Sequence, residues 1–425
     1  MSSRIAPAAR PWLTLIGVAL FLGVLSGRPE FALVAVPLCL PFLRAIRPVA
    51  RPDYRLSHSV SATRLFEGER LAVTVRLTAG SPIPVIELLE PLPPSARLVS
   101  GSNRAVFALQ PGQEIRWCYE LECRGRGRFT LGTLHVRVWE RSGVYLHESC
   151  HRGPRAVAVY PRVAPLRRVP QPRRTQTSAG DYVSPAFGEG LEPGEIRPFA
   201  PGDRVKHVNW RASLRLGKLY VTRQHLERNA DVVVMLDTLA QVGMPPGSSL
   251  DLCVGVASAL AGAYLARKDR VGLIEYGGVL RWVRPASGRP QLERILDALL
   301  DAQVWFSYVT QDLAMVPPRV LPTHALVIAV SPLLDSRFLT ALGDLVNRGF
   351  DVVLLSLSPI DVTRTSLECS LVEELACRLW SLERQAQLAD LRRRGLCAVE
   401  WHPDQPLELA LEGLGRNRRQ RGVAA

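Results

Sequence analysis

Asp237 and Thr238 are the residues best placed for metal chemistry in this chain. Asp237 ends the apolar run "ADVVVMLD" (230–237), and Thr238 follows it directly. Ligands of parallel sheets bind at the carboxyl ends of the strands, and Mg²⁺ takes oxygen ligands. Thr238 is the only hydroxyl near Asp237 in the sequence, and one carboxylate without convergent oxygens makes a poor magnesium site. We therefore expect no metal or other cofactor here, and a carboxylate that caps the next loop. Mg²⁺ at Asp237 is the alternative.

Motifs of nucleotide-binding and hydrolytic enzymes are missing from the sequence. It contains no Gly-x-x-x-x-Gly-Lys-Ser/Thr phosphate loop, no Gly-x-Ser-x-Gly, no His-Glu-x-x-His and no Cys/His set with catalytic or zinc spacing. Two acids, Glu189 and Glu192, lie in a Gly-rich loop, where we expect them to be solvated. The protein is therefore not expected to be an enzyme. A hydrolase acting through Asp237 or Asp203 is the alternative.

The stretch "IRPFAPGDRVKHVNWRAS" (196–213) is too particular for a plain linker. Its Pro201-Gly202 pair favours a type II turn. The Asp203 carboxylate is placed to accept backbone N–H groups, or to pair with Arg197 or Arg211. These features predict a locally fixed loop.

The second half of this stretch contains Trp210, an apolar anchor whose indole N–H needs a partner. It opens "WRASLRLGK" (210–218), which predicts a short helical turn before a strand, "KLYVTRQH" (218–225), beside the first core strand. One interpretation is that the segment clamps the linker to the next domain. The other is a partner-docking surface, since Arg and Trp are favoured interface residues. Its candidate residues are Arg197, Pro201, Gly202, Asp203, Trp210, Arg211 and Arg215.

The net charge of +14 comes mostly from Arg. It suggests an anionic partner, but Arg spread over the whole chain also fits a coding bias. The aromatic residues, 7% of the total, are not interleaved with the Arg clusters, so no stacking platform for nucleic acid is visible. We expect no nucleic acid and favour anionic lipid of the inner membrane as the electrostatic partner. The clusters are Arg162, Arg167, Arg168, Arg173 and Arg174, and then Arg416, Arg418, Arg419 and Arg421.

None of the eight cysteines forms a Cys-x-x-Cys pair. The simplest interpretation is free and mostly buried thiols in a reducing compartment. A Cys118–Cys123 disulfide is the alternative if the domain is exported. The eight are Cys39, Cys118, Cys123, Cys150, Cys253, Cys369, Cys377 and Cys397.

Residues 1–50 contain two uncharged runs, 11–27 and 31–43. Each is somewhat shorter than the ~20 residues of a straight membrane span. No small-x-small site follows the first run, so two transmembrane helices are favoured over a cleaved signal peptide. Positive charge at both outer ends places the ends, and the rest of the chain, in the cytoplasm. We expect a multi-pass protein of the cell membrane.

Residues 51–165 alternate between apolar and polar residues in short runs separated by Gly/Pro turns, which predicts a β-sandwich. The clearest runs are 70–79, 114–123, 133–140 and 156–163. Residues 166–229 form the linker and the segment described above. Residues 161–201 are rich in Pro and basic residues and show little periodicity, so we expect a connecting arm that is partly extended.

Residues 230–425 alternate apolar strands with helices and end in a basic tail. This predicts an open, doubly wound α/β sheet. Expected strands are 230–237, 270–278, 324–331, 350–358 and 396–401. Expected helices are 249–269 with Ser249 as cap, 291–302, about 335–348 and about 367–394. The fold class is therefore α/β plus all-β, behind an N-terminal helical hairpin.

The chain resembles the bacterial membrane proteins with a von Willebrand A-like domain catalogued as domain of unknown function fifty-eight. Three stretches carry the resemblance: the segment around "FAPGDRVKHVNWRAS", "RGRGRFTLG" with "WERSGVY", and "DRVGLIEYGG". A von Willebrand A-type domain carries Asp-x-Ser-x-Ser at its metal site, and a second Asp after the fourth strand. This chain has Leu239, Gln241 and Pro332 at those positions, and Asp335 follows three residues later.

The resemblance implies a MoxR-type AAA+ ATPase as partner. Because the chain has no phosphate loop, the ATPase would be a separate protein. The leading hypothesis is a membrane-anchored, non-enzymatic adaptor that presents the α/β domain to that ATPase, in the assembly or maturation of other proteins. Alternatives are a hydrolase of unknown substrate and a basic protein that binds a membrane surface or nucleic acid.

Overall fold

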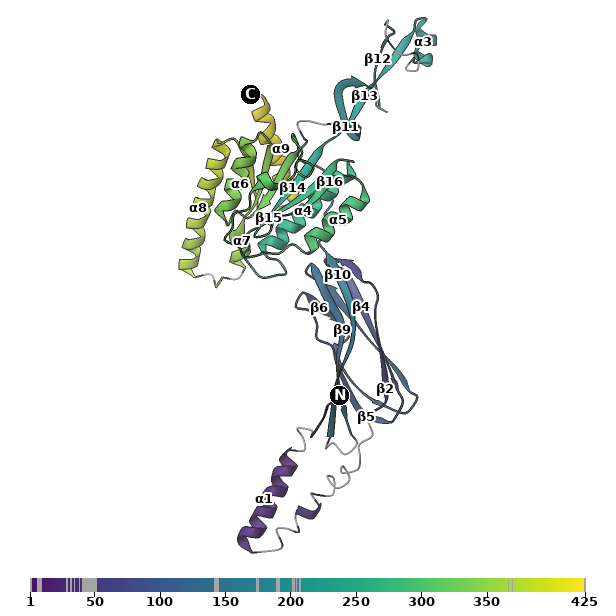
Figure 1. Ribbon diagram of the computed structural model, residues 1–425, viewed down its shortest axis with the longest axis vertical. Helices are drawn as coiled ribbons and strands as arrows, with labels where there is room; N and C mark the ends of the chain where they lie inside the picture. Colours follow the sequence, from purple (N-terminus) through teal and green to yellow (C-terminus); the bar gives the residue numbers. More distant parts are fainter. Residues whose placement is uncertain are drawn as a thin grey trace. The chain divides into compact units, whose positions relative to one another are not determined.

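The computed structural model divides into two compact units, Met1–Tyr160 and Pro161–Ala425 (Figure 1). The structure describes residues 2–5, 10–27, 30, 33, 35–37, 39, 52–140, 145–172, 176–188, 192–200, 203, 205, 208–365, 367–368 and 370–423.

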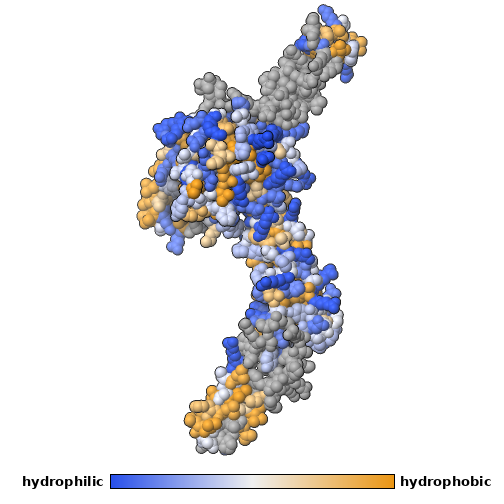
Figure 2. Space-filling view, in the orientation of Figure 1, coloured by the Kyte–Doolittle hydropathy of each residue, from blue (hydrophilic) through white to orange (hydrophobic). Residues whose placement is uncertain are grey.

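An apolar helix, α1 (Arg10–Ser26), lies near the N-terminus, and most of its side chains are exposed (Figure 2). It has 17 residues. Within the described ranges, one helix is both long and apolar enough to cross a membrane, and that is the core helix α4 (Ser249–Ala266). The second predicted span, 31–43, lies largely outside the described residues. The structure therefore does not support the predicted two-helix hairpin. In this region it describes one apolar helix, α1.

The first unit contains two sheets that share one core. One sheet has the order β1-β10-β9-β5-β7, with β3 paired to β10, and the other has the order β2-β4-β8-β6. Side chains from both sheets meet in a single hydrophobic cluster. The strands are β1 (Ser2–Ile5), β2 (Tyr54–Val60), β3 (Arg64–Phe66), β4 (Arg70–Ala79), β5 (Ile83–Leu89), β6 (Ala96–Ser100), β7 (Arg104–Leu109), β8 (Glu114–Cys123), β9 (Gly127–Trp139) and β10 (Tyr145–Tyr160).

Alternation in the sequence matches burial in β4 and β8, because successive side chains of a strand point to opposite faces. In β4, Leu71, Val73 and Val75 are at most 1% exposed, and the residues between them are not buried. In β8, Cys118 is exposed and Cys123 is buried. These two thiols lie on opposite faces of one strand, and both are free. The alternative disulfide is therefore wrong.

The second unit begins with a stretch, 161–172, that packs on two helices of its own unit. The Tyr264 hydroxyl of α4 donates to the Pro170 carbonyl (2.5 Å). Arg168 forms an ion pair (2.8 Å) with Glu412 of helix α9 (Leu407–Val423), and Arg167 donates its backbone N–H to Glu408 (3.0 Å). Part of the predicted basic arm is therefore attached to the α/β unit.

Two further segments of the arm form strands, which its lack of periodicity did not predict. β11 (Gln176–Gly188) and β12 (Glu192–Pro198) both pair with β13 (Tyr220–Asn229) in a separate three-stranded sheet. The expectation that this last strand lies beside the first core strand is wrong. The main chain of 220–229 is already paired on both edges, so no edge is left for the core sheet.

The core sheet of the second unit has the order β16-β15-β14-β17-β18-β19, and only β16 is antiparallel. The five parallel strands, taken in chain order, lie as 2-1-3-4-5, which is a doubly wound order. The antiparallel edge strand was not expected from the sequence. The strands are β14 (Asp231–Thr238), β15 (Arg270–Gly277), β16 (Arg281–Ala286), β17 (Leu326–Ser331), β18 (Asp351–Leu357) and β19 (Cys397–Trp401).

Both faces of this sheet are covered. α4, α5 and α9 share a hydrophobic core with one face, and α6 and α8 share a second core with the other. Two details differ from expectation. Ser248, not Ser249, caps α4, in a capping box with Asp251. The helix expected at 367–394 is preceded by a separate short helix, α7. The remaining helices are α5 (Arg289–Leu300), α6 (Ser336–Asn347), α7 (Pro359–Arg364), α8 (Leu371–Arg393) and α9 (Leu407–Val423).

Candidate functional site

Asp237 lies at the carboxyl end of β14, and its side chain is 1% exposed. Oδ1 accepts the Leu239 N–H (3.0 Å), and Oδ2 accepts the Ser331 hydroxyl (2.5 Å). The predicted cap of the following loop is confirmed. Burial raises the pKa of Asp237 to about 7, although both hydrogen bonds oppose the rise. The carboxylate therefore holds the loops after two neighbouring strands together.

The second acid at this edge, Asp335, has its own partner. It caps α6, and Arg337 forms an ion pair with it (2.7 Å between Nη2 and Oδ2). The hydrogen bonds from Arg337 hold the pKa of Asp335 below its ordinary value. At the other expected ligand positions stand Leu239, which is buried, Gln241 and Pro332. Of the described groups, the Ser331 hydroxyl already donates to Asp237, and the Asp335 carboxylate is already paired with Arg337.

A buried arginine fixes the neighbouring strand ends. Arg384 of α8 is 3% exposed, and its guanidinium donates to the carbonyls of Pro332 (2.6 Å) and Leu357, and to the Ser356 hydroxyl (2.5 Å). Its Nε forms an ion pair with Glu400 (2.5 Å). One side chain therefore connects the ends of β17, β18 and β19. No sequence motif marks Arg384, although it occupies a core-facing position of its helix, in line with Cys377 and Leu388.

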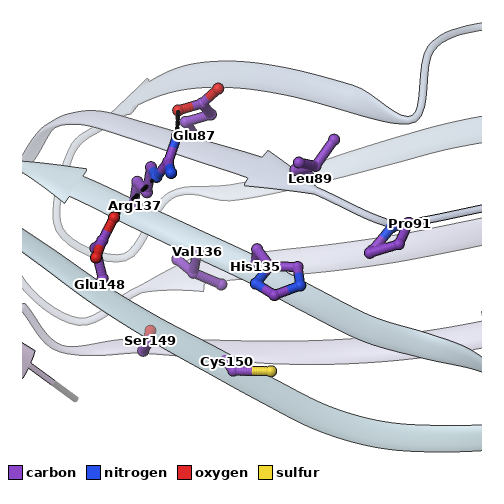
Figure 3. A pocket seen from close by; sticks show the side chains of 9 residues that line it. All are labelled: Glu87, Leu89, Pro91, His135, Val136, Arg137, Glu148, Ser149 and Cys150. Carbon is purple, nitrogen blue, oxygen red and sulfur yellow. Dashed lines mark hydrogen bonds and ion pairs between the residues drawn. The ribbon is translucent and has the colours of Figure 1, made fainter.

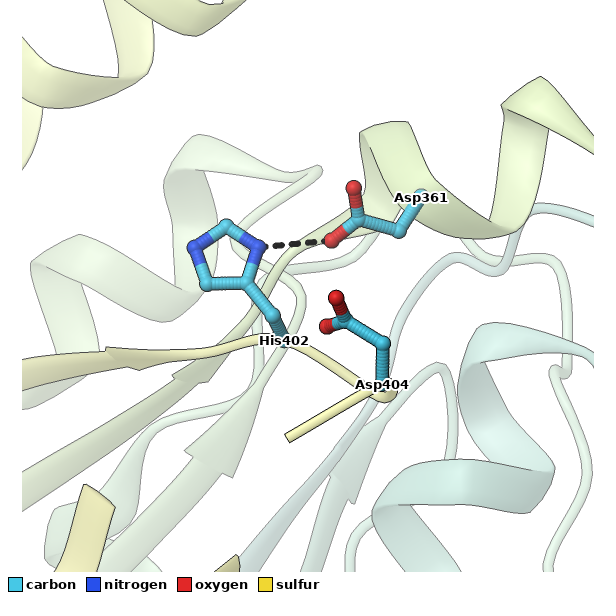
Figure 4. Close-up of side chains that lie close together, drawn as sticks. All are labelled: Asp361, His402 and Asp404. Atoms are coloured by element: carbon cyan, nitrogen blue, oxygen red, sulfur yellow. Dashed lines mark hydrogen bonds and ion pairs between the residues drawn. The ribbon is translucent and has the colours of Figure 1, made fainter. Parts of the chain in front are cut away.

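Three polar side chains gather farther along the same edge (Figure 4). Asp361 is in α7, directly after β18, and His402 and Asp404 follow β19. His402 Nδ1 lies 2.7 Å from Asp361 Oδ2, and one ligand atom from each residue lies within 4.8 Å of the others. An imidazole nitrogen with carboxylate oxygens is a ligand type for Zn²⁺ or Mn²⁺. His402 and Asp361, both partly exposed, also satisfy each other through this hydrogen bond, which accounts for their approach without an ion.

Within the 196–213 segment, Arg197 and Asp203 form an ion pair of 2.5 Å. The other carboxylate oxygen accepts the Ala200 N–H (2.8 Å). The predicted roles of Asp203 are confirmed, and its partner is Arg197 and not Arg211. Pro201 and Gly202 lie outside the described residues.

The helix after this loop, α3 (Trp210–Leu216), is capped by the Asn209 side chain, which accepts the Ala212 N–H (3.0 Å). Ser213 is buried and accepts the Tyr220 N–H (2.9 Å), which attaches α3 to β13. Trp210, at the start of the helix, is 60% exposed. It does not anchor the segment to the described chain, because the helix turns Ser213 and not Trp210 inward.

The exposed side of α3 combines apolar and basic groups. Leu214 is 84% exposed, and Arg211 and Arg215 are exposed beside it. Figure 2 shows hydrophobic atoms over this helix. The segment therefore brings Arg197 and Asp203 together internally and leaves Trp210, Arg211 and Arg215 on the surface.

A groove of about 650 Å³ lies on the first unit, along β5, β9 and β10 (Figure 3). Arg137 donates to Glu148 (3.1 Å) and lies 3.9 Å from Glu87, so the charges in the groove are paired. Cys150 and His135 stand opposite each other on β10 and β9 and also line it. The lining combines these paired charges with the apolar residues Leu89, Pro91 and Val136.

One known protein family matches part of the second unit. The profile of the family described as "Protein of unknown function DUF58" matches residues 195–361, which include the Arg197–Asp203 loop and the sheet from β14 to β18. The uncharacterized proteins Mb1516 of Mycobacterium bovis and Rv1480 of Mycobacterium tuberculosis are each 27% identical over 139 residues. The match covers 32% of this chain, and it spans only 44% of the length of these relatives.

Solved structures match about a quarter of the chain at low similarity. One is the cupredoxin domain of amoB from Nitrosocaldus yellowstonii, at 14% identity, over 25% of this chain and 86% of that one, with a TM-score of 0.19. Another is native alpha-2-macroglobulin from Escherichia coli, at 12% identity, over 27% and 25% of the two chains, with a TM-score of 0.20. At such scores the likeness has no consequence for fold or function.

Proposed function

We propose that this chain is a membrane-anchored, non-enzymatic adaptor that presents a von Willebrand A-like domain to a MoxR-type AAA+ ATPase. Its role would be in the assembly or maturation of other proteins. The observation that carries the proposal is the 196–213 segment. The Arg197–Asp203 ion pair and the capped helix α3 fix the backbone on either side of Trp210, and the Trp210 side chain is 60% exposed. An exposed tryptophan on a fixed backbone, with Arg beside it, is typical of a protein-binding surface.

The state of Asp237 supports a binding role over a catalytic one. A buried acid with a pKa of about 7 is also a general-base candidate. A base needs a reacting group within reach, and both oxygens of Asp237 already bond to the chain. The same bonds leave little capacity for a Mg²⁺ ion. The parallel sheet with one antiparallel edge supports the von Willebrand A-like assignment.

The membrane anchor is proposed from α1 and its exposed apolar side chains. Lipid of the inner membrane would be its partner, and the soluble units would lie in the cytoplasm. The groove of the first unit is the surface through which that unit would hold a second partner or the substrate protein.

The test is affinity isolation of the full-length tagged chain from membranes in mild detergent. Recovery of an AAA+ ATPase with the parent chain is expected, with at least a roughly tenfold loss in Trp210→Ala, as for an interface hot spot. Trp282→Ala is the matched control, because Trp282 is also exposed (40%) but lies on β16. Recovery of no AAA+ protein, or equal loss in both variants, would contradict the proposal.

A further inference from the structure

The outer face of α8 is apolar and exposed over most of the helix. Val372 is 75% exposed, Leu375 50%, Leu379 69% and Leu382 63%. Figure 2 shows hydrophobic side chains over this helix, which Figure 1 labels at the edge of the α/β unit. Exposed apolar surface of this extent marks an interaction site in a soluble unit.

The spacing of these residues is that of a heptad repeat. Steps of three and four residues run through positions a and d and end in two small residues that are also exposed. Val at a with Leu at d is a pairing found in parallel two-stranded coiled coils. The a and d positions are Val372, Leu375, Leu379, Leu382, Ala386 and Ala389.

The opposite face of α8 explains why this stripe is turned outward. Cys377, Arg384 and Leu388 are buried against the sheet, and Arg384 holds three strand ends. A rotation of the helix that buried the leucines would break these contacts. The capping box of Ser370 and Glu373 fixes the first turn as well. The apolar stripe is therefore a fixed surface feature.

The charges beside the stripe select the partner. Arg378 occupies position g and Glu383 the following e, five residues later. In a parallel pair of identical helices, a g residue faces the e residue five positions on in the other helix. Arg378 would meet Glu383 of the second copy, twice by symmetry. Neither side chain takes part in an ion pair among the described residues. An antiparallel arrangement would place Arg378 opposite Gln385 and lose the attraction.

We propose that α8 associates with α8 of a second copy of this chain, as a parallel pair along this stripe. The stripe is about 27 Å long for about 18 residues, which is short for an interface. Because interfaces of this size bind weakly, the dimer should be reversible and concentration-dependent. It does not depend on the ATPase partner.

Charge reversal tests both the partner and the direction of the helices. The full-length chain in mild detergent is measured by analytical ultracentrifugation over a range of concentrations. Arg378→Glu alone and Glu383→Arg alone should each raise the dimer dissociation constant roughly tenfold, since two attractions become repulsions. The double variant should return to the parent value. Glu374→Arg, an exposed charge off the stripe, is the matched control and should change nothing.

A second measurement covers the apolar contact. Leu379→Glu replaces an exposed side chain, so the fold should be kept while the dimer is lost. With Leu375→Cys in a background where the exposed Cys118 and Cys150 are Ser, the parallel pair should form a disulfide between the two introduced thiols under mild oxidation. A monomer at every concentration would overturn the proposal. A dimer that persists in Leu379→Glu would also overturn it, as would a double charge variant that does not return to the parent dissociation constant. A third contrary result would be a monomer in which membrane or another part of the chain protects the introduced thiol from oxidation.

Discussion

A buried carboxylate in each unit has a shifted pKa, and the two shifts have opposite signs: the pKa of Glu90 is lowered and that of Asp237 is raised. Glu90, in the first unit, is 0% exposed, and its oxygens receive the Tyr119 hydroxyl (2.5 Å) and the Gly132 N–H (2.6 Å) and lie 3.2 Å from His58 Nε2. Burial raises its pKa, but these three partners outweigh burial, so the pKa of Glu90 is lowered. Asp237 has two neutral donors, and burial prevails there.

The backbone explains part of this difference. Gly132 has a φ of +92°, and a Cβ there would lie 2.3 Å from the Gly153 carbonyl oxygen, so only glycine permits this approach to the neighbouring strand. The Gly132 N–H can then reach Glu90. The first unit therefore uses its buried charge to connect its two sheets, whereas the second unit keeps a carboxylate that is costly to ionise.

The largest expected effect is that of Glu90→Ala. The change leaves the Tyr119 hydroxyl and the Gly132 N–H buried without their acceptor, and we expect the first unit to lose about 3–5 kcal/mol of stability. Native-state hydrogen exchange of β4 and β8 in the full chain measures it, because it separates the two units. Glu114→Ala, at an exposed position of β8, is the control. A loss below about 1 kcal/mol would show that this network does not stabilise the sheets.

The pH dependence of Asp237→Asn gives the next effect. Because the folded pKa of about 7 exceeds the ordinary 3.8, the folded state keeps a proton that the unfolded chain releases between these values. The ionisation penalty is absent below about pH 4 and complete above about pH 7, and it amounts to about 4 kcal/mol. The stability of Asp237→Asn relative to the parent should therefore rise by this amount as pH increases.

Exchange of the β14 amides, corrected for intrinsic rates, follows that difference. For Glu90 the sign is reversed: its stabilisation is present at neutral pH and is lost as pH falls through its lowered pKa. A flat difference curve for Asp237→Asn would mean that the pKa of Asp237 in the fold is not raised above its ordinary value.

The smallest expected effect is that of Ser331→Ala. It removes a donor to Asp237 and the acceptor of the Leu333 N–H (2.8 Å), at a cost of about 1–3 kcal/mol. The loss of the donor also raises the pKa of Asp237 further, so the midpoint of the pH curve should move upward. Thr340→Ala, on the exposed side of α6, should leave both quantities unchanged. An unmoved midpoint would show that the Ser331 hydroxyl does not hold the charge of Asp237.

Much of the fold follows from local patterns. The bounds predicted for 70–79 and 114–123 are those of β4 and β8, because alternation has the period of a strand. The buried run at 230–237 is β14 within one residue. The pairing of Asp203 with Arg197 was also within reach, since the two residues are six positions apart.

The features that the sequence did not predict depend on pairing between residues that are distant in the chain. The sequence predicts a strand at 218–225, and the structure has β13 at 220–229. Its hydrogen-bond partners come from the Pro-rich arm, which has no periodicity to reveal them. Likewise, His402 and Asp361 are 41 residues apart and meet only because β18 and β19 are neighbours.

The sequence of α8 by itself determined a helix whose apolar residues follow heptad spacing, because helical period and capping are local properties. It did not determine which face of that helix would be buried. Arg384, a charged residue, lies inside because three strand ends offer it acceptors, and the leucines lie outside as a result. In the same way, the sequence placed Asp237 at a strand end. Only the packing around it decided that its carboxylate would be buried from solvent, with two hydrogen-bond donors and a pKa of about 7.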